Sequence, residues 1–233
     1  YSERARQYLI ECGLPKERTF VTGSPMAEVL QANWEEIGKS DILQRLSLQK
    51  GKYILLSAHR EENIDTEANF HSLFAAINQM AEKYDLPVLY SCHPRSARKL
   101  EESGFVLDKR VIRHEPLGFH DSNCLQMNAF CVVSDSGTLP EESSFFLSKG
   151  NPFPAVCIRT STERPEAMEK GDFVLAGIGT QELLQAIEVA VSLQEGGDLG
   201  IPVPDYVEEN VSVKVVKIIQ SYTNVVNRMV WRK

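Results

Sequence analysis

The sequence lacks a long apolar run. None of its uncharged hydrophobic stretches approaches the ~18 residues that a membrane-spanning helix needs, and the strongest, at 52–59 and 129–136, have the length of buried strands. The charged, amphipathic start of the chain contains no apolar signal segment. We therefore expect no membrane partner. Because the chain begins with Tyr1 rather than Met, we also expect it to be a piece of a longer product.

Cysteine is scarce and is not arranged for metal binding. The five cysteines are odd in number and scattered, and no C-x-x-C or H-x-x-x-H pair is present. Their spacing excludes the common zinc motifs and a disulfide framework. Cys131 and Cys157 lie within apolar runs, which is typical of buried thiols. These features predict a chain without a metal ion or another cofactor, in a reducing cytoplasm.

Basic residues are outnumbered by acidic ones. The chain has 25 Lys and Arg against 32 Asp and Glu, a formal net charge of −7, which argues against a general binder of nucleic acid or of anionic membranes. A small anionic ligand is not excluded, since a local cluster of donors is enough to hold it. The hydrophobic share of 42% excludes a disordered chain.

Short apolar runs alternate with helical patterns along most of the chain. Several runs are continuously apolar, which is typical of parallel strands buried on both faces. Within 66–84, Phe70, Leu73, Phe74 and Ile77 follow helical spacing. Repeated strand–helix units predict an α/β fold, a Rossmann-like doubly wound parallel sheet. The expected strands are 19–22, 53–57, 87–91, 110–113, 130–134, 154–158 and 173–176, and further helices are expected at 95–103, 121–128, 138–148 and 180–193.

The two ends of the chain stand outside this alternation. Residues 1–50 predict an amphipathic helix that stops at Gly13, one strand and two short helices. Residues 195–206 are rich in Gly and Pro and predict a linker, which leads to a final helix at about 208–231. That helix has a long apolar stripe and therefore needs a partner surface.

Polar side chains follow the strands at the edge where an open α/β sheet binds ligands. Ser136 and Gly137 lie where a strand turns into a helix, so free N–H groups and the helix dipole favour a phosphate. Glu142 can reach back to a ribose diol. The alternative is plain helix capping by Ser136 or Thr138. A serine nucleophile is disfavoured because G-x-S-x-G is absent.

Three further loops carry donors at strand ends. His59, with Arg60 beside it, can hold a pyrophosphate or act as an acid or base; the alternative is a capped surface loop. Arg164 follows Ser161 and Thr162 in a loop that is equally typical of a capping box. His93 lies in the fourth loop, where a solvated loop is the default interpretation.

Three ordered motifs carry a family resemblance. SAHREEN at 57–63, VVSDSGTLPEES at 132–143 and TSTERPEA at 160–167 resemble the non-hydrolysing UDP-N-acetylglucosamine 2-epimerase family, and TGSPMAEVL at 22–30 resembles its interdomain segment. The match covers nearly the whole chain. HREEN and SDSGTLPEESS look most like the branch that forms UDP-N-acetyl-L-fucosamine from UDP-2-acetamido-2,6-dideoxy-L-talose.

The resemblance implies a domain organisation. The family has two Rossmann-like domains of the GT-B type with the UDP-sugar between them, and this chain resembles the C-terminal half. Residues 1–35 would be a remnant of the N-terminal domain with the interdomain segment, and 36–194 the UDP-binding domain. Residues 195–233 would be the linker and a helix that crosses back to the N-terminal domain. The implied partners are that domain and a second copy, in a homodimer of the full-length protein.

The resemblance also implies roles for individual residues. Ser136 and Gly137 would contact the diphosphate, Glu142 the ribose hydroxyls, and His59 the diphosphate or the reacting centre. Arg164 would help to close the phosphate pocket.

Three other positions differ among relatives. Arg60 and His93 match positions that bind a second, regulatory UDP-sugar in some of them. Ser122 stands where relatives often place an aromatic side chain against uracil, so here backbone groups would hold the base.

The family reaction is anti-elimination of UDP to a 2-acetamidoglycal, followed by re-addition after proton exchange at C2. The family supplies the carboxylates for C2 from its N-terminal domain, so we expect this chain to be the UDP-binding half and inactive alone. The products would serve bacterial surface polysaccharides. Two alternatives are the donor domain of a GT-B glycosyltransferase, which does not ordinarily carry HREEN with TERPEA, and a non-catalytic UDP-sugar-binding module.

Overall fold

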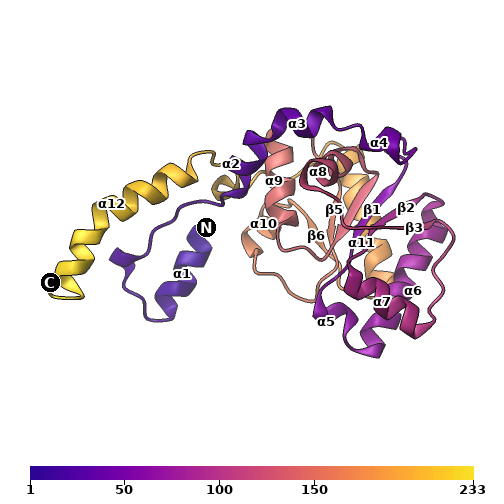
Figure 1. Ribbon diagram of the computed structural model, residues 1–233, viewed down its shortest axis with the longest axis horizontal. Coiled ribbons are helices and arrows are strands. Elements are labelled where there is room, and N and C mark those ends of the chain that lie inside the picture. Colours follow the sequence, from indigo (N-terminus) through magenta and orange to yellow (C-terminus); the bar gives the residue numbers. More distant parts are fainter.

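Six short strands form a single parallel sheet in the computed structural model, which describes residues 1–233 (Figure 1). The strand order is β3-β2-β1-β4-β5-β6, and every neighbouring pair is parallel. The predicted doubly wound sheet is therefore confirmed. The chain reverses direction across the sheet between β1 and β4, and in such sheets ligands bind at that reversal. The strands are β1 (Ile54–Ser57), β2 (Val88–Ser91), β3 (Val111–His114), β4 (Cys131–Ser134), β5 (Ala155–Cys157) and β6 (Val174–Leu175).

Alternate residues of the central strands enter two separate cores. Ile54 and Leu56 face one core, whereas Tyr53 and Leu55 face the other, because successive side chains of a strand point to opposite faces. Both faces are covered by helices, which explains why the strands are continuously apolar.

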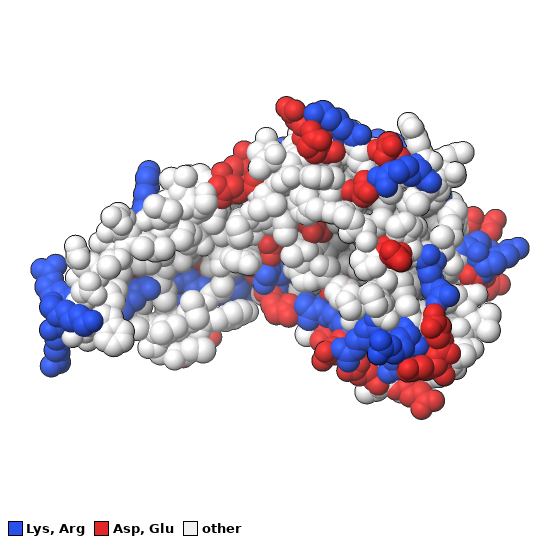
Figure 2. Space-filling model, in the orientation of Figure 1, with Lys and Arg blue, Asp and Glu red and all other residues white.

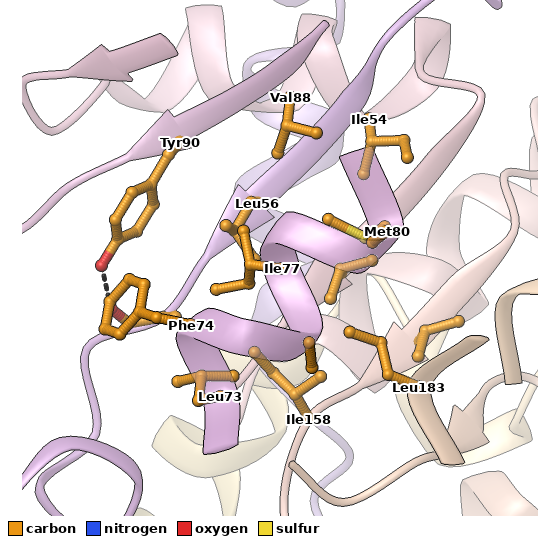
Figure 3. Close-up of a cluster of buried hydrophobic side chains, with 14 of the residues drawn as sticks. Ile54, Leu56, Leu73, Phe74, Ile77, Met80, Val88, Tyr90, Ile158 and Leu183 are labelled. Carbon is orange, nitrogen blue, oxygen red and sulfur yellow. Dashed lines mark hydrogen bonds between the residues drawn. The ribbon is translucent and has the colours of Figure 1, made fainter. Parts of the chain in front are cut away.

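The first core lies under α6 (Glu67–Tyr84) and α11 (Thr180–Glu195), with α5 (Glu61–Ile64) and α7 (Pro94–Ser103) at its margin. Thr66 begins α6 by accepting a hydrogen bond from the Asn69 N–H at 3.2 Å. Figure 3 shows Leu73, Phe74 and Ile77 of this helix facing the sheet. Tyr90 of β2 is buried there and satisfies its hydroxyl by donating to the Ala58 carbonyl at 2.8 Å.

The second core lies on the opposite face, under α8 (Phe119–Asn128), α9 (Leu139–Ser148) and α10 (Pro165–Glu169). Three short helices, α2 (Met26–Ala32), α3 (Trp34–Lys39) and α4 (Ile42–Arg45), pack over it. Trp34 contacts the ring of Phe145 edge-on, with centroids 5.7 Å apart. Two short helices were expected in this region, so α2–α4 add one to the prediction.

An arm projects from this body, formed by α1 (Glu3–Glu11), the 3₁₀ turn η1 (Lys16–Arg18), residues 19–22 and α12 (Val211–Met229) (Figure 1). Val211 is the only buried residue of α12. Its apolar side chains Val216, Ile219 and Met229 are largely exposed, and Figure 2 shows mostly uncharged groups along the middle of the arm, with Lys and Arg gathered at its free end. None of the helices has both the length and the apolar character needed to cross a bilayer.

The predicted strand at 19–22 is wrong. These residues are extended but have no strand beside them, and a strand forms only by pairing with another. They run along α12 instead. Phe20 packs edge-on against Tyr222 at 5.1 Å, and the Tyr222 hydroxyl donates to the Glu17 carbonyl at 2.7 Å.

The predicted linker at 195–206 begins with Glu195, the last residue of α11, and is otherwise irregular apart from the 3₁₀ turn η2 (Pro204–Tyr206), but it is firmly attached to the body. Val203 and Tyr206 are buried in the second core. The Val203 N–H donates to Ser144 Oγ at 2.9 Å, and Ser144 Oγ donates to Asp172 Oδ2 at 2.8 Å. Burial raises the pKa of Asp172 to about 7, although Ser143 and Ser144 both donate to it.

Truncating the first core should destabilise the fold strongly. Phe74 is fully buried, so Phe74→Ala is expected to lower the free energy of unfolding by ~3–5 kcal/mol, measured by denaturant titration. Val106→Ala is the control, because Val106 is 80% exposed and its truncation should cost less than ~0.5 kcal/mol. Equal losses in both variants would contradict the assignment of this core.

Asp172 should make stability depend on pH. An aspartate in the unfolded chain titrates near ~4, so between that value and about 7 the folded carboxyl keeps a proton that the unfolded chain releases. The free energy of unfolding therefore falls as pH rises through this window, with a slope of at most ~1.4 kcal/mol per pH unit. Asp172→Asn should remove this slope in denaturation curves measured from pH 4 to 7. If the free energy of unfolding changed equally with pH in wild type and Asp172→Asn, Asp172 would not be the source of the pH dependence.

Candidate functional site

Two of the four polar loops predicted as ligand contacts meet where the strand order reverses. Ser57 at the end of β1 is in register with Ser134 at the end of β4. The loop at 58–63 follows the first strand and the turn at 135–138 follows the second. Because parallel strands place their carboxyl ends at one edge, His59 and Ser136 come to lie beside one cavity.

The turn into α9 presents unpaired N–H groups. Ser134 Oγ accepts from the Ser136 N–H at 3.0 Å, and Ser136 Oγ accepts from the Thr138 N–H at 3.3 Å. The N–H groups of Gly137 and Leu139 donate to no group of the chain. A helix start with free N–H groups favours an anion such as a phosphate.

Arg60 adds a positive charge beside this turn. A Cβ at Gly137 would lie 3.4 Å from Arg60 Nη2, so the guanidinium rests against the glycine backbone. Arg60 Nε donates to the Asp135 carbonyl at 3.0 Å, which fixes the side chain there. Arg60, expected to contribute to a regulatory site, thus lies at the candidate phosphate turn itself.

Glu142 lies one turn into α9 with both carboxylate oxygens engaged. Oε1 accepts from Thr138 Oγ1 at 2.9 Å, and Oε2 accepts from Gln126 Nε2 at 2.9 Å. Burial raises the pKa of this carboxyl group. Glu142, Ser136, Ser122 and His59 all line one cavity of about 130 Å³. The rest of its wall is formed by Leu55, Ser57, Ser91, Gln126, Val132, Ser134 and Leu139.

His59 is held by the carboxylate of Asp135. His59 Nδ1 lies 3.1 Å from Asp135 Oδ1, with the imidazole half-exposed and the carboxylate fully buried. The adjacent carboxylate of Asp135 raises the pKa of His59. The ring of His93 lies 6.3 Å from that of His59. His93 begins α7, where its Nδ1 accepts from the Arg95 N–H at 3.3 Å, and it does not line the cavity.

Arg164 lies apart from this cavity. Its Nε and Nη2 donate to Glu141 Oε1 at 3.0 and 2.9 Å. The buried Glu141 also accepts from the Ser24 hydroxyl, and the guanidinium lies 5.1 Å from the centre of the Tyr1 ring. The structure therefore connects Arg164 to the segment at 22–30, and its expected contact with a phosphate stays a prediction.

Two buried residues that contact the candidate site residues, Asp135 and Gln126, were not predicted from the sequence. Asp135 was not singled out because a short Asp between serines is typical of capping, and only the pairing of β1 with β4 buries it. Gln126 carried no signal, since it belongs to no motif of α8. Its Oε1 is buried and accepts no hydrogen bond. No cluster of three or more His, Cys, Asp or Glu side chains is placed to hold a metal ion.

The same fold occurs in solved structures of epimerases. The structure of UDP-N-acetylglucosamine 2-epimerase from Rickettsia bellii matches all of this chain and 61% of its own, with 38% identity and a TM-score of 0.88. That of the Methanocaldococcus jannaschii UDP-GlcNAc 2-epimerase, in complex with UDP-GlcNAc and UDP, matches 94% of this chain and 59% of its own, with a TM-score of 0.81. At 24% identity, this second match shows the fold alone.

Sequence comparison agrees. The UDP-N-acetylglucosamine 2-epimerase of M. jannaschii is 27% identical over 198 residues, which are 82% of this chain and 53% of that protein. The chain thus spans about half the length of the curated relatives it matches. The model of the family described as UDP-N-acetylglucosamine 2-epimerase matches residues 1–220. With that match over most of its length, this chain belongs to the UDP-N-acetylglucosamine 2-epimerase family.

Proposed function

We propose that this chain is the UDP-binding half of a UDP-sugar 2-epimerase, which inverts C2 of a UDP-2-acetamido sugar. The observation that carries the proposal is the cavity at the reversal of strand order, where Glu142 and His59 flank a helix start with unpaired N–H groups. Relatives named UDP-N-acetylglucosamine 2-epimerase support it, as does a neighbour described as bound to UDP-GlcNAc.

The proposed pose follows from the donors and acceptors along the cavity. The diphosphate lies over Ser136 and Gly137, where it accepts from the free N–H groups of Gly137 and Leu139 and faces the Arg60 guanidinium. The ribose hydroxyls donate to Glu142. Uracil lies beyond the ribose, toward Ser122 and toward Gln126, whose Oε1 accepts no hydrogen bond from the chain. Arg164, which is held by Glu141, helps to close the phosphate side.

The chemistry needs stabilisation of a leaving group. The C1–O bond breaks and its electron pair leaves on UDP, while a base takes the C2 proton, giving a 2-acetamidoglycal. UDP then adds back to C1, and a proton returns to the opposite face of C2. Charge grows on the diphosphate as the bond breaks, so the N–H groups, Arg60 and a protonated His59 lower the barrier.

The base for C2 is not provided by this cavity. Glu142 is its only carboxylate, and it is committed to Thr138, Gln126 and the ribose. We therefore assign the C2 chemistry to an N-terminal domain. The exposed apolar side chains of α12 and α1, such as Ile219, Val216 and Leu9, supply a surface that such a domain would cover.

We also propose a second, regulatory UDP-sugar bound at Arg60 and His93. Arg60 lies against Gly137, and the His93 ring lies 6.3 Å from that of His59, so a ligand bound there would affect binding in the main cavity.

The assignment of Glu142 is testable by UDP titration. Glu142→Ala should weaken UDP binding about 10- to 100-fold, since a charged hydrogen-bond acceptor is lost, as measured by calorimetry. Glu188→Ala is the matched control, because this exposed glutamate is on α11 across the sheet. Wild type should also bind 2′-deoxy-UDP less tightly than UDP, whereas Glu142→Ala should not discriminate. Wild-type affinity in the variant would remove Glu142 from the site.

Activity should require more than this chain. With UDP-N-acetylglucosamine in D₂O, the 233-residue chain should show neither epimerisation nor incorporation of deuterium at C2, monitored by proton NMR, while still binding UDP. The complete gene product should show both, and a parallel assay with UDP-2-acetamido-2,6-dideoxy-L-talose identifies the preferred sugar. Turnover by the chain alone would contradict the assignment of the C2 chemistry to an N-terminal domain. A complete gene product that binds UDP but is inactive would favour a non-catalytic binding module.

A further inference from the structure

Asp135 lies at the centre of the two loops that form the site. Its side chain is fully buried, and its N–H donates to the Ser57 carbonyl at 3.1 Å, across the β1–β4 pair. Asp135 Oδ2 accepts from the N–H groups of His59 and Arg60, each at 2.8 Å, and from Asn63 Nδ2 at 3.2 Å. One carboxylate oxygen thus shapes the whole loop at 59–63.

The second oxygen of this carboxylate faces the imidazole. Oδ1 accepts no well-aligned hydrogen bond from the chain and lies 3.1 Å from His59 Nδ1, and a buried carboxylate is stable only when its oxygens are paired. Nδ1 is therefore the nitrogen that carries the proton toward Asp135. The other nitrogen, Nε2, lies on the far side of the ring, and His59 lines the cavity.

We propose that Asp135 is a positioning residue for His59, which holds Nδ1 protonated and presents Nε2 to the diphosphate. The role toward the diphosphate rests on the proposed function, whereas the hold on the imidazole does not. Asp135 itself does not line the cavity, so it acts on a ligand only through the ring. An imidazole in this setting donates from Nε2 when it is protonated, which suits an anionic leaving group.

The other charged groups around His59 do not supply this hold. Arg60 opposes the charge on the ring and lowers the pKa of His59. His93 lies 6.3 Å away, ring to ring, and Glu142 shares the cavity but is engaged by Thr138 and Gln126. Ser57 Oγ, a neutral group, lies 3.4 Å from Nδ1. Asp135 is the anion in contact with the ring.

The direction of the pH dependence follows from this pair. Asp135 raises the pKa of His59, so the imidazolium persists to a higher pH than in an ordinary histidine. The contribution of His59 to binding a diphosphate is present below that pKa and is lost as pH rises through it.

The test is NMR of the His59 ring in the 233-residue chain, which needs no ligand. In wild type, ¹⁵N shifts should show the Nδ1–H form above the pKa, and the pKa should exceed the ordinary value of ~6.5. Asp135→Asn keeps an oxygen for the loop N–H groups but loses the charge, so the pKa should fall by about one unit or more. Asp85→Asn is the matched control, because this exposed carboxylate lies at the C-terminal end of α6 and pairs with Arg110, and it should leave both readings near wild type.

The same variants are then titrated with UDP at several pH values. In Asp135→Asn, affinity at pH 7 should fall about tenfold, with the pH step moved to lower pH. An Nε2–H form in wild type, or an unchanged pKa in a folded Asp135→Asn chain, overturns the proposal. The wild-type reading decides even if that variant does not fold. A confirmed NMR result without UDP binding in wild type leaves Asp135 as the residue that holds the ring and refutes the proposed function instead.

Discussion

The pairing of β1 with β4 is the constraint on which the rest of the site depends. This pair lies where the strand order reverses, and its register sets Ser57 opposite Ser134. The loops that follow must therefore share one small volume, and the buried carboxylate of Asp135 fills it. Because side chains alternate along a strand, a slip of one residue would move Asp135 to the other face of the sheet. The N–H groups of His59 and Arg60 would then lose their common acceptor.

Much of the fold could be predicted because local patterns and burial agree. The stripe Phe70, Leu73, Phe74 and Ile77 has helical spacing and is buried along α6, and the continuous apolar runs became strands covered on both faces. The exception at 19–22 shows what local patterns omit. Its β-type residues need a neighbouring strand, and α12 is beside them instead. The irregular segment at 195–206 shows the converse, since Val203 and Tyr206 are held by the second core.

The site was predictable to the extent that it follows from parallel topology. Ser136, Gly137 and His59 were found from their positions at strand ends, and the structure places all three at one edge; Glu142 and Ser122 line the same cavity. Asp135 and Gln126 were not predicted, because their roles depend on contacts between the turn after β4 and the loop after β1, and between α8 and α9, that no short motif encodes. The contact of Arg164 with the buried Glu141 could not be predicted either, because the two residues are brought together only by folding. The net charge of −7 does not exclude a small anion, because one helix start and one guanidinium are enough to bind it.

The cavity beside Glu142 also has a consequence for inhibitor chemistry. Its wall is dominated by hydroxyl and amide groups, with only Leu55, Val132 and Leu139 as apolar contacts. A hydrophobic aromatic fragment would remove water from those polar groups without forming hydrogen bonds to them, which weakens its binding. The buried Oε1 of Gln126, which accepts no hydrogen bond from the chain, would instead accept one from a compact heterocycle with one N–H donor. Selective compounds for this pocket should therefore be small, flat and hydrogen-bonding, and should gain little from added lipophilicity.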